Sequence, residues 1–257
     1  MIIFLKTQEE IEGFRHAGRV AARILKTLLA AVHAGVTTVA LDEIARVECQ
    51  RIDATPTFLN YNGFPAAICT SVNRTMVHGI PDSRKLESGD LLSLDLGITI
   101  DGFIGDVAAT MKVPAFHWHN QEDLSPEPML ISACRTALRE AIHKAVPRNR
   151  LSDISAAIAG VAETFGFSTP IQYGGHGINR YTLHAQPFIP NDSNLMDEDI
   201  TLYPGMVLAI EPMFIDSKSN RVEIMADGWS VVAQGNCSHF EHTIAVTEFD
   251  PLILTEE

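Results

Sequence analysis

Apolar residues at helical spacing predict helices in both halves of the chain. In the first, such residues recur from Ile11 to Val32. The preceding TQEE is a capping box, in which the side chains of Thr7 and Glu10 satisfy each other's helix-end donors. The same spacing predicts further helices over about residues 39–52, 129–145 and 151–165. The first two helices carry no obvious reactive group and are expected to cover a sheet.

The apolar run LLSLDL predicts a buried strand. The Asp101-Gly102 pair after it is a turn signal, because Asp-Gly tolerates the positive φ of a tight turn. Asp95 lies in this strand and Asp106 in the next, so a hairpin would bring them side by side. A buried charge must be paired or bound to a metal. Two Asp residues that are hydrogen-bonded at strand ends would explain this stretch equally well.

The segment at residues 58–77 is also strand-like and is rich in aromatic residues. Its Asn62-Gly63 pair predicts a second hairpin. The large apolar side chains of this segment are expected in the core. His78 follows the segment, and a lone histidine at a strand end is usually structural.

The two halves of the chain share a short stretch of partial sequence similarity. The stretches LESGDLLSLDLGI and LYPGMVLAIEPMFI each place an acid six residues after a glycine, as Asp95 follows Gly89 and Glu211 follows Gly205. Farther on, FEHTIAVTE places Glu241 in another apolar strand. A duplicated fold would therefore bring four carboxylates together, and two divalent ions could share them. Internal similarity this weak also arises by chance.

Histidines supply a second type of candidate ligand. His176 lies in YGGHGINRYTLHAQP, where flanking glycines let backbone come close and leave the imidazole in the open, and His184 follows eight residues later. A glycine turn with two surface histidines is the alternative. One imidazole with four carboxylates is a mixed ligand set that suits Mn, Fe, Co, Ni or Zn more than Mg or Ca. His117 and His119 look like a metal-site fragment, but their Pro-rich polar surroundings predict an exposed loop.

The composition excludes several functions. A chain of 257 residues can bury a sizeable core, and its net charge of −13 argues against nucleic acid as the main ligand, without excluding transient contact with a ribosome. No apolar run is long enough to span a bilayer, and the N-terminal segment lacks the apolar core of a signal peptide. The cysteines are widely spaced and fit neither a zinc site nor a disulfide framework, so a reducing, cytoplasmic setting is expected.

Five motifs, in order along nearly the whole chain, resemble the type I methionine aminopeptidases. They are VHGIPD (77–82), LDLGITIDGFIGD (94–106), GGHGINR (174–180), AIEP (209–212) and FEHT (240–243). The resemblance implies an α/β (α+β) pita-bread fold with two pseudo-symmetric halves, roughly residues 1–120 and 121–257, around a central antiparallel sheet with helices outside. It also implies a monomer with one catalytic domain, 1–257, that removes the N-terminal methionine from peptides and nascent proteins when the next residue is small.

The resemblance implies roles for particular residues. The ligands of two divalent ions would be Asp95, Asp106, His176, Glu211 and Glu241. Asp106 and Glu241 would bridge the ions, with Asp95 on one ion and His176 and Glu211 on the other. Glu211 would also be the proton shuttle. Two histidines, His78 and His184, would contact the substrate backbone. The methionine pocket would be formed by Tyr61, Phe64, Cys69 and Trp229.

The chain departs from the family pattern near these residues. Asn179 stands where family members usually have Gly, Ala185 where they usually have an acid, and Val77 where they often have Cys. One extra residue separates the two histidines of this region. We expect this insertion to loosen the pocket edge at Leu183.

Two other functions remain open from the sequence. An aminopeptidase or dipeptidase of related fold could act at Xaa-Pro bonds, but such enzymes usually carry an extra N-terminal domain, and the first motif here arrives too early for one. A catalytically inactive binding module or a paralogue with altered preference is the other alternative. Inactive modules usually lose ligands, whereas this chain has all five.

Overall fold

The computed structural model describes residues 2–115 and 127–256, so the predicted loop with His117 and His119 lies outside the described residues. The predicted helices are present as α1 (Gln8–Ala31), α2 (Thr38–Arg51), α3 (Met129–Lys144) and α4 (Leu151–Phe165). The capping box at α1 is also present, because the Glu10 N–H donates to the Thr7 hydroxyl and the Thr7 N–H donates to the Glu10 carboxylate. No helix among the described residues has the length and apolarity needed to cross a membrane.

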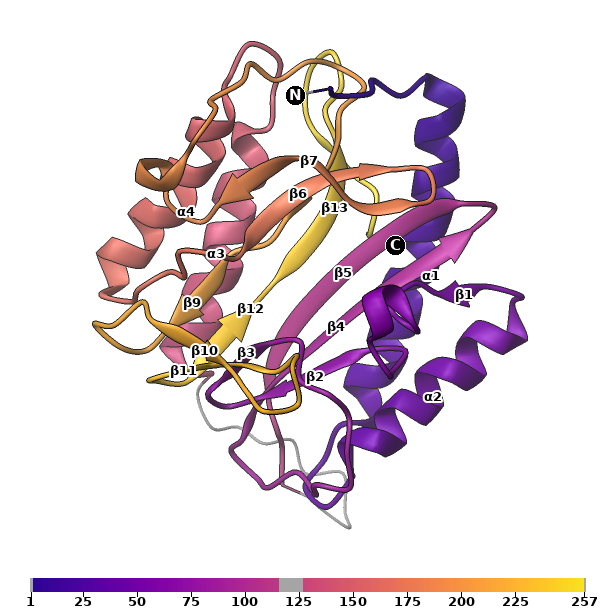
Figure 1. Ribbon diagram of the computed structural model, residues 1–257, viewed down its shortest axis with the longest axis vertical. Coiled ribbons are helices and arrows are strands. Elements are labelled where there is room, and N and C mark those ends of the chain that lie inside the picture. The colour runs from indigo at the N-terminus through magenta and orange to yellow at the C-terminus, as the bar shows by residue number, and fades with distance from the viewer. Residues whose placement is uncertain (1, 116–126, 257) are drawn as a thin grey trace.

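A nine-stranded antiparallel sheet forms the centre of the molecule (Figure 1). Its strands are β1 (Thr55–Pro56), β2 (Cys69–Val72), β4 (Leu91–Ile100), β5 (Phe103–Lys112), β6 (Gly174–Asn179), β7 (Thr182–Pro190), β8 (Val207–Ile210), β13 (Glu241–Ala245) and β14 (Leu252–Ile253). The main order is β1-β4-β5-β13-β8-β6-β7, with β2 paired to β4 and β14 paired to β13. The remaining short elements are β3 (Thr75–Val77), β9 (Met213–Ile215), β10 (Val222–Ile224), β11 (Val231–Ala233), β12 (Cys237–His239), and the 3-10 helices η1 (Tyr61–Gly63) and η2 (Ser193–Leu195).

The N-terminal and C-terminal halves of the sheet meet where β13 pairs with β5, with Glu241 opposite Ala108. Helix α1 packs against β4 and β5, and α3 packs against β8 and β13, so each half is covered by its own helices (Figure 1). Gly89 and Gly205, which precede β4 and β8, have nearly equal φ values of +91° and +92°. The partial sequence similarity therefore corresponds to two glycine turns of nearly equal φ, each followed by a strand of the sheet. The predicted α/β class, with a central antiparallel sheet and outer helices, is confirmed.

The predicted hairpin of β4 and β5 is present and turns at Asp101-Gly102, where φ is +51° and +83°. Asp95 lies opposite Ala108 in this hairpin. Asp106 is two residues from Ala108, and side chains two residues apart on a strand point to the same face. The hairpin thus presents Asp95 and Asp106 on one face of the sheet.

The predicted hairpin at Asn62-Gly63 is wrong. These residues lie in η1, with φ of +50° and +91°. The Asn-Gly pair signals left-handed backbone, which turns other than hairpins also use, and Asn62 departs from helical dihedral angles within η1. The chain instead reverses at Asn73, which has φ of +55° and lies between β2 and β3. Its side chain fixes this turn to β4, because it donates to Asp90 at 2.7 Å and accepts from the Leu91 N–H at 2.8 Å.

Candidate active site

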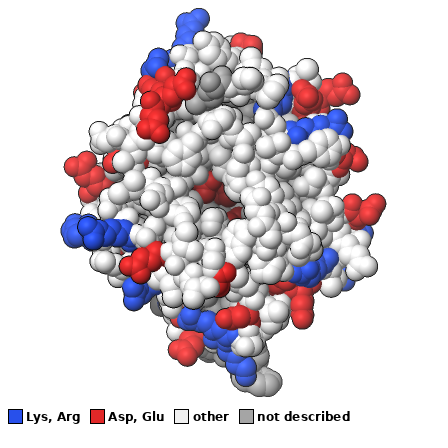
Figure 2. All heavy atoms as spheres, in the orientation of Figure 1, with Lys and Arg blue, Asp and Glu red and all other residues white. Residues whose placement is uncertain are grey.

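Four carboxylates come from four neighbouring strands of the sheet. Asp95 lies on β4, Asp106 on β5, Glu241 at the start of β13, and Glu211 directly after β8. Because β4, β5, β13 and β8 are consecutive in the sheet, the two halves bring their acids together at the line where they meet. All four residues are buried, with exposed fractions of 9% or less. Figure 2 shows acidic atoms at the bottom of a hollow near the middle of this face.

These carboxylates lack the partners that buried charges need. Asp95 Oδ1, Asp106 Oδ1 and Glu241 Oε1 are buried and have no hydrogen-bond partner among the described residues. Burial raises the pKa of Asp106 to about 7. Burial, followed by repulsion from neighbouring carboxylates, raises the pKa values of Asp95, Glu211 and Glu241 well above their usual range. Such a cluster must bind protons or cations to be stable.

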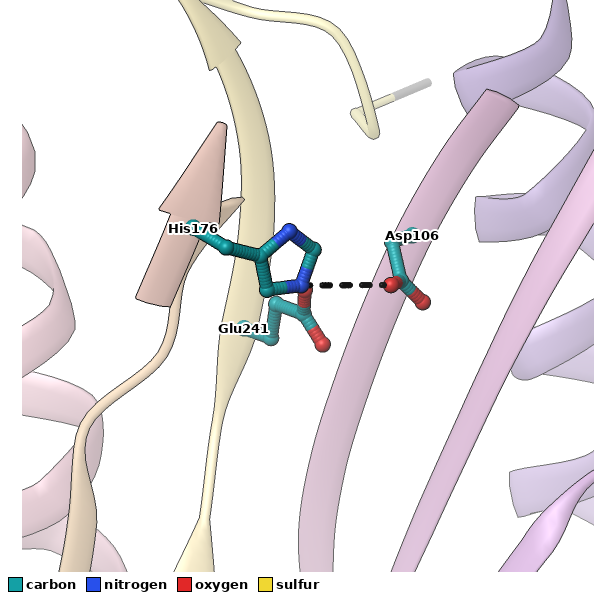
Figure 3. A group of neighbouring side chains, drawn as sticks. All are labelled: Asp106, His176 and Glu241. Atoms are coloured by element: carbon teal, nitrogen blue, oxygen red, sulfur yellow. Dashed lines mark ion pairs between the residues drawn. The ribbon is translucent and has the colours of Figure 1, made fainter. Parts of the chain in front are cut away.

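His176 on β6 adds an imidazole to the carboxylates (Figure 3). Its Nε2 lies 4.0 Å from Asp106 Oδ2 and 3.5 Å from Glu211 Oε1. Its Nδ1 lies 3.0 Å from the Gly177 carbonyl oxygen, which can only accept, so the proton belongs on Nδ1 and the Nε2 lone pair faces the acids. Burial lowers the pKa of His176 to about 3 and keeps the ring neutral, as a metal ligand must be.

The glycines around His176 have a packing role that the sequence reading did not anticipate. A Cβ at Gly175 would lie 2.3 Å from the Ala209 carbonyl oxygen, and one at Gly177 would lie 2.1 Å from that of Gln186. They therefore allow β6 to lie close to β8 and β7. The expectation that they leave the imidazole in the open is wrong, because His176 is only 7% exposed.

The donor set fits divalent metal ions. Ligand atoms of Asp106, His176 and Glu241 lie within 4.8 Å of one another, and so do those of a second group that contains Glu211, Glu241 and His239. Glu241 belongs to both groups, so neighbouring ions could share it. Carboxylate oxygens together with neutral imidazole suit transition metals. The buried oxygens without partners are thus explained if cations occupy this cluster.

His239 is the residue of this cluster that sequence reasoning missed. It lies on β12, and its Nε2 is 3.4 Å from Glu211 Oε2. The sequence does contain a signal that His239 lies beside the acids. It stands two residues before Glu241, and alternate residues of an extended segment share a face. The short apolar strands around it made the period-two pattern hard to see.

The two other predicted histidines lie beside the carboxylates. His78 follows β3 with a φ of +59°, and its ring faces that of Tyr173 at a centroid distance of 5.9 Å. His184 lies on β7, with its ring centroid 4.5 Å from that of His176 and its Nδ1 3.1 Å from the Tyr61 hydroxyl. Burial lowers the pKa of His78 to about 4, with a smaller contribution from His184, so His78 is a neutral hydrogen-bonding group at pH 7.

The predicted pocket residues share a cavity of about 260 Å³ with the acids and histidines. The cavity is lined on its less polar side by Tyr61, Phe64, Cys69, Leu183 and Trp229. Phe64 and Trp229 pack edge to face, with ring centroids 5.2 Å apart. Cys69 lies opposite Asp95 in the pairing of β2 with β4, so it joins the apolar wall to the acids.

Without metal, the protein should become less stable as the pH rises above about 7.5. A carboxyl group whose pKa is raised by folding stabilises the folded state when protonated. This stabilisation is lost progressively as the pH rises toward the raised pKa, which is about 7 for Asp106 and well above the usual range for Asp95, Glu211 and Glu241. The buried histidines have lowered pKa values and act in the opposite direction at lower pH, but above about pH 7.5 they are neutral in both states. We expect a falling melting temperature in chelator-treated protein and a smaller fall with a divalent ion added. A melting temperature that rises over this range would contradict the shifts.

Comparisons with known proteins agree with this site. A sequence model described as metallopeptidase family M24 matches residues 12–248. The chain is 40% identical to the methionine aminopeptidase of Aquifex aeolicus, with both proteins covered in full. It superposes on the crystal structure of methionine aminopeptidase from Thermotoga maritima with a TM-score of 0.90 at 35% identity, again over the whole of both chains.

A more distant similarity addresses the first alternative function. A prolidase from Pyrococcus furiosus matches with a TM-score of 0.73 at 18% identity, and the alignment covers 98% of this chain but 65% of the prolidase. At this identity the match shows a shared fold alone.

The close relatives confirm the resemblance drawn from the five motifs and the pita-bread fold that it implied, and the chain belongs to metallopeptidase family M24.

Proposed function

We propose that this protein removes the N-terminal methionine from peptides and nascent proteins whose second residue is small. The observation that carries the proposal is the buried cluster of four carboxylates and His176 in the same cavity as an aromatic pocket. The acids would attract the positively charged amino terminus, and the pocket would receive the first side chain. An enzyme that recognises a free amino terminus in this way is an exopeptidase.

Two divalent ions are the proposed cofactors, and cobalt, manganese, iron, nickel and zinc all suit the donors. The proposed ligands are the five residues Asp95, Asp106, His176, Glu211 and Glu241. Asp106 and Glu241 occupy the inner pair of strands, where the halves of the sheet meet, which suits the bridging role. When bound, such ions activate water and polarise the scissile carbonyl group.

Glu211 is the proposed proton shuttle. Its carboxylate lies between two imidazoles, with Oε1 3.5 Å from His176 Nε2 and Oε2 3.4 Å from His239 Nε2. It can accept a proton from the attacking water and deliver it to the leaving amine. His78 and His184 are proposed to hydrogen-bond the substrate backbone, because both line the cavity as neutral imidazoles.

The proposed methionine pocket combines aromatic rings with a thiol. An unbranched thioether packs flexibly against such groups. Burial first, and then the neighbouring Asp95 charge, raise the pKa of the Cys69 thiol well above its usual range, so Cys69 is an uncharged wall residue. Leu183, at 1% exposure, packs in the same wall and was expected to be loosened by the insertion.

We propose that irregular pairing of β6 with β7 accommodates the inserted residue. The register of these strands shifts between His176 and Gly177 and again between Gly177 and Asn179. Such bulges take up an extra residue within a strand. His184 consequently stays against His176, and we propose that it keeps its role at the substrate despite the insertion. Asn179 itself accepts a hydrogen bond from the Lys6 ammonium group, which ties this hairpin to the N-terminal segment.

We also propose a single catalytic domain over residues 1–257, acting as a cytoplasmic monomer. The two halves share one sheet and both contribute acids to one site, which favours a single domain. The described cysteines are free and buried, as expected in a reducing compartment. Contact with the ribosome would be transient, given a net charge of −13.

A peptide panel at fixed metal loading tests the proposed function. We expect Met-Ala-Ser to be cleaved fastest and peptides with a bulky second residue to be cleaved poorly. Replacing methionine by leucine or norleucine should reduce kcat/KM by about 10–200-fold or less, because one methylene in an apolar pocket discriminates weakly. Equal rates for Met-, Ala- and Lys-initiated peptides would contradict the pocket. Selective cleavage of Ala-Pro would favour the Xaa-Pro alternative.

A further inference from the structure

His239 has a rigidly held backbone at the edge of the carboxylate cluster. Its N–H donates to the Thr110 hydroxyl at 2.8 Å, and the same hydroxyl donates to its carbonyl oxygen at 2.9 Å. Ser93 lies 2.8 Å from this hydroxyl and can donate to it. On its other side, His239 lies opposite Met213 in the pairing of β12 with β9. These contacts prevent the residue from withdrawing from the cluster.

The imidazole of His239 is buried without a partner. Its side chain is 2% exposed, and neither Nδ1 nor Nε2 has a hydrogen-bond partner among the described residues. Buried polar groups are nearly always paired, so an orphaned ring requires an explanation. The ring is directed at the acids, because Nε2 lies 3.4 Å from Glu211 Oε2.

The spacing of these atoms favours coordination over hydrogen bonding. An N–H···O bond is usually about 2.9–3.0 Å long between its heavy atoms. Two ligands of a tetrahedral ion, each about 2.0–2.1 Å from it, lie about 3.3–3.4 Å apart. The distance of 3.4 Å from His239 to Glu211 fits the second case. An atom of Glu241 completes a group whose members all lie within 4.8 Å of one another.

We propose that His239 is a sixth protein ligand of the metal centre, binding through Nε2 the ion that Glu211 and Glu241 hold. The inference rests on the proposed two-ion centre and extends its ligand set. It adds a second imidazole to the ion that His176 and Glu211 hold, whereas the position near Asp95 is built from carboxylates. Nitrogen donors favour Co²⁺, Ni²⁺ and Zn²⁺ over Mn²⁺. The centre should therefore bind one Co²⁺ much more tightly than Mn²⁺.

Metal titration of the whole protein tests this proposal without relying on activity. Chelator-treated wild type and His239→Gln are titrated with Co²⁺ and with Mn²⁺ in a calorimeter, and His143→Gln on the exposed side of α3 is the matched control. We expect His239→Gln to weaken one Co²⁺ binding event by at least about tenfold, to change the other little, and to affect Mn²⁺ less. The control should match wild type. Unchanged Co²⁺ binding in His239→Gln would overturn the proposal.

X-ray absorption of Co²⁺-loaded wild type keeps the proposal falsifiable if the variant does not fold. We expect the signal of two imidazoles per loaded centre, from His176 and His239. A signal of one imidazole would overturn the role of His239. If wild type binds no Co²⁺ at all, the proposed metal centre itself fails, which is a different result from retained binding with a single imidazole.

Discussion

Replacing Glu211 by Gln should reduce turnover of a Met-Ala peptide by about a hundredfold or more, because it removes a proton acceptor from the reaction. The change preserves the shape of a buried side chain that lies between two imidazoles. It also removes a negative charge from a cluster in which burial and neighbouring carboxylates raise the pKa of Glu211. The metal-free variant should therefore be at least as stable as metal-free wild type.

The measurement is kcat for both proteins after loading to equal metal content. Glu223→Gln is a matched control, because Glu223 is exposed on β10 and lies outside the cavity. It should keep the wild-type rate within about twofold. A wild-type rate for Glu211→Gln would remove Glu211 from the mechanism. A melting temperature far below that of wild type would indicate a structural effect instead.

Replacing Asp106 by Asn should reduce metal affinity by more than about a hundredfold, since changes to outer-shell groups alone cost 10–100-fold. Asp106 is 3% exposed, and its backbone is fixed to Thr243, whose hydroxyl accepts from the Asp106 N–H and donates to its carbonyl oxygen. The side chain therefore cannot move to let another ligand replace it. In the proposed bridging position, it contributes to both ions.

Metal retained after gel filtration is the measurement for Asp106→Asn. Asp101→Asn makes the same change in the turn of the same hairpin, where Asn tolerates the positive φ of +51°. This control should retain as much metal as wild type. Equal retention by Asp106→Asn would show that Asp106 is no ligand.

The hairpin that carries Asp95 and Asp106 was predictable because its signals are local. The Asp101-Gly102 turn needs positive φ, and the apolar alternation around it fixes which residues share a face. The sequence similarity between the two halves was also a local signal, since each glycine turn lies just before its strand. The pairing of β5 with β13 is not local, and it could be predicted only by assuming a duplicated fold.

Residues positioned by long-range pairing could not be predicted in the same way. The Asn62-Gly63 pair was misread because a left-handed turn does not specify whether its flanking segments pair. Trp229 stands just before β11, and it is the pairing of β11 with β3 that brings it to Phe64. No local feature of the sequence indicates that these two strands pair. His239 depends on the pairing of the three-residue strands β9 and β12. Strands this short have too few residues for a periodic pattern to be recognised.

Release of methionine from Met-Ala-Ser during metal reconstitution tests the central claim most directly. The protein is stripped with a chelator, shown to be folded, and titrated separately with Mn²⁺, Co²⁺ and Zn²⁺ while free methionine is measured. We expect no release without metal, and activity that rises with added ion and saturates at no more than two bound ions per chain. Methionine release by the stripped protein at the fully loaded rate would contradict the account, as would the absence of release with every divalent ion tested.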